Sequence, residues 1–189
     1  MRKILLISFC CLAFNMTSKA QQYSKGYLDS VKEFYRQWSE NTERFTNPVI
    51  LNNTSDPAIV GRYLSRIKPK KLIIRDGKSD SLIITKKELS YVLQRIKESE
   101  KFTWDDNFFK GSKIIDTAEL SLMKVGCLRE NKCAIQWVFS LPAFLRNNTY
   151  AVIYSEWFTF KGSGEGALIF FKNENGKWSK VGKAEEILY

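Results

Sequence analysis

The fold class is decided by residues 147–181, which read NNTYAVIYSEWFTFKGSGEGALIFFKNENGKWSKV. Runs rich in β-branched and aromatic residues alternate here with short segments of Gly, Asn and Ser, a pattern typical of strands joined by tight turns. Asn175-Gly176, between two such runs, is typical of a type I′ hairpin. We therefore predict an antiparallel β-meander with strands over residues 135–141, 149–161, 167–172 and 177–181.

The residues before this meander carry helical patterns. Apolar side chains recur at intervals of three and four in three segments, which are predicted to be amphipathic helices: 24–43, 57–67 and 86–101. Thr85 and Glu88 have the spacing of a capping box at the start of the third helix. Two β-branched runs, 71–75 and 81–85, predict a hairpin, and a short helix is predicted near 117–123.

Helices and a hairpin thus precede the meander, without the alternation of strands and helices that builds a parallel sheet. We predict the α+β class, in a single domain that is helix-rich to about residue 104 and an antiparallel sheet from about residue 134.

Residues 1–20 have the pattern of a signal peptide. Arg2 and Lys3 precede an apolar run of about eleven residues, which is too short to span a membrane, and Ala20 suits signal peptidase. We predict cleavage after Ala20, which leaves residues 21–189 as a periplasmic or secreted domain without a transmembrane segment.

The four cysteines fall into two pairs. Cys10 and Cys11 lie in the predicted signal peptide, where lipidation is the alternative, although bulky residues precede both. Cys127 and Cys133 are separated by five residues rich in turn formers, and export makes an oxidised pair reasonable. We predict a structural disulfide between them; two free thiols are the alternative.

The composition excludes several kinds of chemistry. The chain of 189 residues has no histidine, which removes His-dependent catalytic triads and His-ligated zinc. Residues 1–20 hold three basic and no acidic side chains, so the remainder has 27 basic and 20 acidic ones, a net charge of +7. The basic residues are scattered, and we expect no nucleic-acid partner, no metal and no cofactor.

The candidate binding residues are aromatic and acidic side chains near predicted loops: Trp104, Asp106, Trp157 and Glu165. An exposed indole beside a polar loop stacks on a sugar or fills a pocket of a partner, whereas a buried indole only packs the core. The glycine-rich segment 162–166 is interpreted as a flexible hairpin tip, because a phosphate cradle precedes a helix rather than a strand.

These residues favour a non-catalytic binding protein of the cell envelope, whose partner is a protein or a glycan. An immunity or inhibitor protein is one version of this hypothesis. The alternative is a hydrolase acting on glycan, which needs two carboxyl groups roughly 5 to 10 Å apart across a cleft. Its candidate carboxylates are Asp105, Asp106, Glu156 and Glu165.

Several segments resemble a group of small exported Bacteroidota proteins without assigned function. They are WDDNFFKGSK (104–113), FSLPAF (139–144), NTYAVIY (148–154), GEG (164–166) and KNENGKW (172–178). The resemblance covers residues 85–182 and implies a periplasmic or surface protein, but no activity. Relatives often carry two cysteines where this chain has Thr159 and Ser163.

Three Asp-Ser or Asp-Thr pairs followed by an apolar residue resemble the O-glycosylation sequon of exported Bacteroidota proteins. Their acceptor residues are Ser30, Ser81 and Thr117. Helix caps and turns use the same residue types, which is the alternative interpretation. The resemblance implies glycan on at least one of the three, with Ser81 favoured.

Overall fold

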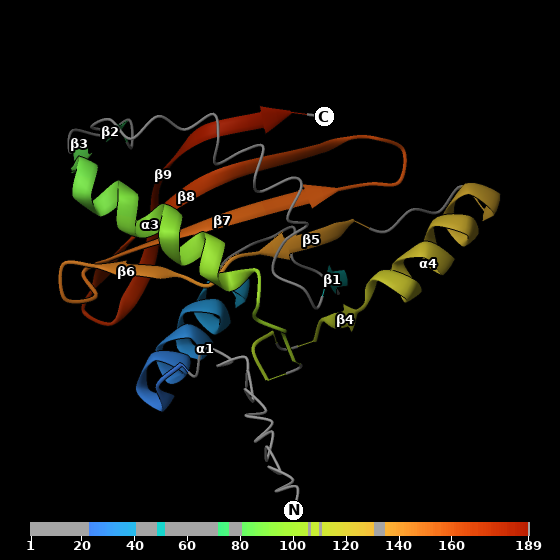
Figure 1. The fold of residues 1–189 in the computed structure, drawn as a ribbon, viewed down its shortest axis with the longest axis horizontal. Coiled ribbons are helices and arrows are strands. Elements are labelled where there is room, and N and C mark those ends of the chain that lie inside the picture. Colours follow the sequence, from blue (N-terminus) through green and yellow to red (C-terminus); the bar gives the residue numbers. More distant parts are fainter. Residues whose placement is uncertain are drawn as a thin grey trace, which may run out of the picture.

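The computed structural model describes residues 23–40, 49–51, 72–75, 81–105, 107–109, 111–130 and 135–188. Its elements, in chain order, are α1 (Lys25–Glu40), β1 (Val49–Leu51), β2 (Leu72–Arg75), β3 (Ser81–Ile84), α3 (Lys86–Ser99), β4 (Lys113–Ile115), α4 (Thr117–Glu130), β5 (Gln136–Phe139), β6 (Ala143–Leu145), β7 (Tyr150–Phe158), β8 (Gly164–Glu174) and β9 (Lys177–Leu188). Figure 1 shows α1 and α3 beside the large sheet, and α4 extending away from it at one end. The predicted α+β class is confirmed.

The seven-stranded sheet has the order β4-β1-β5-β7-β8-β9, with β6 also paired to β7. The antiparallel β7-β8-β9 meander and the separate β2-β3 hairpin were both predicted and are confirmed. The strands after residue 134 pair only antiparallel with one another, as predicted, whereas β1, which was not predicted, pairs in parallel with both β4 and β5 and makes the sheet mixed. The predicted helix at 57–67 lies outside the described residues.

Side chains of β7 alternate between two hydrophobic cores, one on each face of the sheet. Val152 and Tyr154 pack with the buried stripe of α3, on the side we call the α3 face. Ala151 and Ile153 pack with α1 and the aromatic segment 102–109, on the side we call the α1 face. The sequence sets this arrangement, because β7 is apolar at nearly every position, as a strand covered on both faces must be.

The strand next to β7 is interrupted between β5 and β6, and three aromatic side chains of the α1 face compensate for the break. They donate hydrogen bonds to main-chain oxygens in or beside it: Tyr27 to Pro142 (2.8 Å), Tyr35 to Ser140 (2.5 Å) and Trp104 to Phe139 (3.3 Å). The Ser140 hydroxyl in turn accepts from the main-chain N–H of Tyr154, at 2.8 Å. The polar main-chain groups at the break are thus satisfied inside the core, as burial requires.

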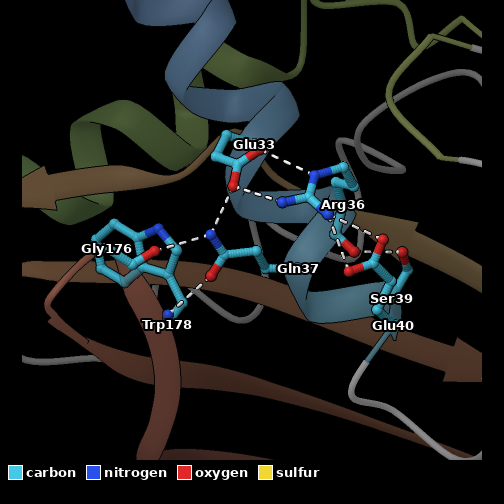
Figure 2. A network of polar contacts seen from close by, with 7 residues as sticks. All are labelled: Glu33, Arg36, Gln37, Ser39, Glu40, Gly176 and Trp178. Carbon is cyan, nitrogen blue, oxygen red and sulfur yellow. Dashed lines mark hydrogen bonds and ion pairs between the residues drawn. The ribbon is translucent and has the colours of Figure 1, made fainter.

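Helix α1 also holds the β8–β9 hairpin. Asn175 and Gly176 both have positive φ, 53° and 82°, which confirms the predicted type I′ turn. Figure 2 shows Gln37 beside this turn: its amide nitrogen donates to the Gly176 oxygen and its amide oxygen accepts from the Trp178 N–H, both at 2.9 Å. Because Gln37 occupies these main-chain groups, this end of β9 is closed to strand addition.

Hydrogen bonds from Arg146 join the β6–β7 turn to the start of α3. Arg146, Asn147 and Asn148 form the turn with positive φ values of 51°, 53° and 63°. Arg146 donates to the Glu88 carboxylate at 2.7 Å and to the Ile83 oxygen at 2.7 Å. Glu88 also completes the predicted capping box with Thr85, which is confirmed. Hydrogen bonds from Arg146, the largest cause, and from Thr85 together lower the pKa of Glu88 to about 2.

The ion pair between Arg146 and Glu88 is expected to make a pH-dependent contribution to stability. Because the pKa of Glu88 is lowered from 4.5 to about 2, the contribution is complete above pH 4.5 and is lost as the pH falls towards 2. Arg146→Met is expected to lower the free energy of unfolding by about 1 kcal/mol at pH 7, because the pair is partly exposed. The effect should shrink between pH 4.5 and 2, measured by urea denaturation at each pH.

Glu88→Gln provides the control, because glutamine keeps the capping box and does not titrate. In that background, the effect of Arg146→Met should not change between pH 7 and pH 2. An Arg146→Met effect of the same size at both pH values in the otherwise unchanged protein would contradict the role of Glu88.

Candidate functional site

The structure places Trp104 in the core. Its side chain is 2% exposed, and its indole lies within 5.2 Å of the Tyr35 and Phe108 rings, measured between ring centroids. The prediction that Trp104 contacts a ligand is therefore wrong. Its indole packs in the aromatic core, and the indole N–H donates a hydrogen bond to the Phe139 main-chain oxygen. The aromatic neighbours in 102–109 are the sequence signal for this packing role. Asp106 lies outside the described residues.

Trp157 and Glu165 are brought together. They lie directly opposite each other in the register of β7 and β8, and both are partly exposed on the α1 face. The indole of Trp157 packs against the edge of the aromatic core. Lys183 of β9 lies 2.7 Å from the Glu165 carboxylate, measured from Nζ to Oε1. We call Trp157, Glu165 and Lys183 the Trp157 patch.

Sequence reasoning missed Lys183. In the β8–β9 register Lys183 stands opposite Ile169, and a β-bulge between Gly166 and Leu168 shifts the pairing. The last strand was predicted to end at residue 181, whereas β9 continues to Leu188, so Lys183 lay beyond the predicted sheet. The Lys183 ammonium reaches the Glu165 carboxylate along the sheet, and the side chains remain 37% and 27% exposed.

The turn that joins β7 to β8 lies next to the Trp157 patch. Its main chain is closed by bonds from the Thr159 N–H to Ser163 (2.8 Å) and from the Gly162 N–H to Thr159 (3.1 Å). The Thr159 hydroxyl oxygen is buried and has no hydrogen-bond partner among the described residues. Only residues 159–163 form the turn, so the prediction of a flexible tip reaching to 166 is wrong: Gly164 and Gly166 are buried in β8.

Glu156 lies on the opposite face of the sheet. It is 3% exposed, and its carboxylate accepts a hydrogen bond from the Tyr154 hydroxyl at 2.8 Å. Gly166 stands opposite Glu156 in the register, and a Cβ at Gly166 would lie 2.6 Å from the Tyr154 hydroxyl oxygen. The glycine is required here because the tyrosine hydroxyl occupies the space that a side chain would take.

Glu156 and Glu165, two of the four candidate carboxylates of the hydrolase hypothesis, do not face each other. Adjacent positions of a strand pair face opposite sides of the sheet, so Glu156 lies on the α3 face and Glu165 on the α1 face. Asp105 is exposed and accepts a hydrogen bond from the Asn107 N–H at 2.8 Å, as in an Asx turn. Within the part of the chain that the structure describes, no cluster of three or more Cys, Asp or Glu could hold a metal ion.

The predicted glycosylation sites occupy different settings. Ser30 lies inside α1, where its hydroxyl donates to the Gly26 oxygen at 3.0 Å. Ser81 begins β3 and Thr117 begins α4, which Asp116 caps by accepting from the Glu119 N–H. In two of the three Asp-Ser or Asp-Thr pairs, a side chain thus hydrogen-bonds within a helix or caps one, as the alternative interpretation expects. Glycosylation stays a prediction.

The predicted disulfide also remains open to test. Cys127 is 4% exposed in α4, and Cys133 lies outside the described residues. A bridge closing this short loop is expected to stabilise the fold by roughly 2 to 3 kcal/mol. Alkylation of the denatured, unreduced protein (residues 21–189) should detect no thiol, and two after reduction. Two thiols without reductant would contradict the prediction.

The fold and the patch define an α+β domain with a mixed sheet, whose α1 face carries a partly exposed indole beside an ion pair. None of the described helices is long and apolar enough to cross a membrane. No family model, curated protein or solved structure matches the chain. Function must therefore be inferred from the chemistry of the Trp157 patch.

Proposed function

We propose that this chain is an exported, non-catalytic binding protein of the cell envelope that recognises its partner with the Trp157 patch. The observation that carries the proposal is the direct cross-strand pairing of a partly exposed tryptophan with the Glu165–Lys183 ion pair. Tryptophan is among the residues that contribute most to binding surfaces, because a large rigid ring is buried at low entropic cost.

The position of the patch in the sheet supports binding without rearrangement. Trp157 is on β7, which is paired with β5 on one side and β8 on the other, and Glu165 is on β8, which is paired with β7 and β9. Pairing on both sides fixes the main chain of these two strands before the ligand arrives. Preorganisation of this kind lowers the entropic cost of association.

The arrangement of acidic groups favours binding over hydrolysis. Glu156 and Glu165 point to opposite faces of the sheet, and the buried Glu156 carboxylate is hydrogen-bonded to Tyr154. The whole sequence contains no histidine that could act as an acid or a base. The signal-peptide pattern of residues 1–20 supports the periplasm or the cell exterior as the place of action, and an immunity or inhibitor protein would be one such binder.

The experiment that tests this function is affinity capture from envelope extract on immobilised protein (residues 21–189). Trp157→Ala is expected to reduce capture at least tenfold, because it removes the central aromatic contact. Lys183→Ala, at an exposed position, should weaken capture without disturbing the core. Tyr91→Ala is the matched control, because Tyr91 is 41% exposed on α3, which covers the other face.

Two outcomes would contradict the proposed function. The first is capture that survives both Trp157→Ala and Lys183→Ala while thermal melts show that the variants are folded. The second is turnover of a captured glycan that Glu165→Gln or Glu156→Gln abolishes, since a binding protein leaves its ligand intact.

A further inference from the structure

We infer that the ligand of the Trp157 patch is a neutral carbohydrate, an inference that rests on the proposed function. The three side chains of the patch supply a flat aromatic ring, a hydrogen-bond acceptor and a hydrogen-bond donor within reach of one another. A sugar ring presents the matching features, since its axial C–H groups form an apolar face and its hydroxyls line the rim.

The spacing suits a single sugar ring. Residues directly opposite in an antiparallel pair have Cβ atoms about 5 Å apart. A ring stacked on the Trp157 indole would therefore have its hydroxyls beside the Glu165 carboxylate, and Lys183 is 2.7 Å from that same carboxylate. A carboxylate accepts up to about four hydrogen bonds and an ammonium donates three, so both groups can bind hydroxyls while they stay paired.

The charge balance of the patch favours a neutral ligand. Glu165 and Lys183 carry opposite charges and are in direct contact. The ion pair has no net charge, so attraction of an anionic ligand to Lys183 is offset by repulsion from Glu165, and attraction of a cationic ligand to Glu165 by repulsion from Lys183. Hydroxyl groups both donate and accept, so they satisfy the two partners together without bringing a charge of their own.

The same composition is less suited to a protein partner. The buried centre of a protein interface is depleted in Lys and Glu. Here these two residue types flank the single tryptophan, with side chains 37% and 27% exposed. A large apolar partner surface would have to desolvate the ion pair, whereas sugar hydroxyls replace the water that solvates it.

The test uses envelope extract in three forms: untreated, oxidised with periodate, which cleaves vicinal diols of sugars, and digested with pronase. Each form is applied to immobilised protein (residues 21–189) and to the Trp157→Ala variant. We expect Trp157-dependent capture to survive pronase, to fall at least tenfold after periodate, and to yield a glycan that an anion exchanger does not retain.

The outcomes separate this inference from the proposed function. Trp157-dependent capture that survives periodate, that pronase removes, or that yields an acidic glycan would overturn the neutral carbohydrate and leave the proposed binding function standing. Absence of Trp157-dependent capture from all three extracts, with the variant folded, would overturn both.

Discussion

Replacing Tyr35 with alanine is expected to lower the free energy of unfolding by about 4 kcal/mol, as is typical for truncation of a large buried aromatic side chain. Tyr35 is fully buried between α1 and the sheet, and its ring lies 4.7 to 6.0 Å from the rings of its aromatic neighbours, measured between centroids: Phe34, Trp38, Trp104, Phe109 and Phe139. The substitution leaves a cavity at the centre of the α1 face. Urea or guanidinium denaturation of the two proteins measures the difference.

Tyr35→Phe separates the hydroxyl from the ring. It should cost about 1 to 2 kcal/mol, because it removes the donor that serves the buried Ser140 oxygen at 2.5 Å while leaving the packing intact. Tyr91→Phe, at an exposed position, should change stability little and serves as the control. A Tyr35→Ala effect below about 1 kcal/mol would contradict the packing described for α1.

Gly166→Ala is expected to destabilise the protein by about 2 kcal/mol, although alanine is normally tolerated in strands better than glycine. The added Cβ would lie 2.6 Å from the Tyr154 hydroxyl oxygen, in the buried α3 face. Either the tyrosine shifts and loses its hydrogen bond to Glu156, or the two strands move apart. Chemical denaturation measures the loss.

A double-substitution cycle tests this cause. In a protein that already carries Tyr154→Phe, the closest remaining atom is a ring carbon at 3.3 Å, so Gly166→Ala should cost less than about 1 kcal/mol. Gly126→Ala is the matched control, because nothing lies within 4 Å of a Cβ there and alanine favours the helix. Equal costs of Gly166→Ala in both backgrounds would exclude the steric explanation.

The parts of the fold that sequence predicted well are those with strong local signals. The capping box at Thr85 fixed the start of α3, and Asn175-Gly176 fixed the last hairpin. The strands β1 and β4 were not predicted, because three residues carry too little periodicity to distinguish a strand from a loop. Helix α4 is longer than predicted, since its apolar residues do not gather on one face.

The candidate site could be predicted only by residue type. Trp157 and Glu165 were named correctly as neighbours of a polar loop, but nothing local separated the partly exposed Trp157 from the buried Trp104. The faces of Glu156 and Glu165 depend on the register of one hairpin, since a shift of one residue would reverse both. Lys183 was missed because β9 continues to Leu188, beyond the predicted end of the last strand at residue 181.

Hydrogen exchange of the protein (residues 21–189), with and without saturating captured ligand, tests most directly that the Trp157 patch is the binding surface. We expect slower exchange in peptides that cover residues 157–165 and the β9 segment around Lys183, with no change in α3. Slower exchange confined to α3 or α4, with none in 157–165, would contradict it.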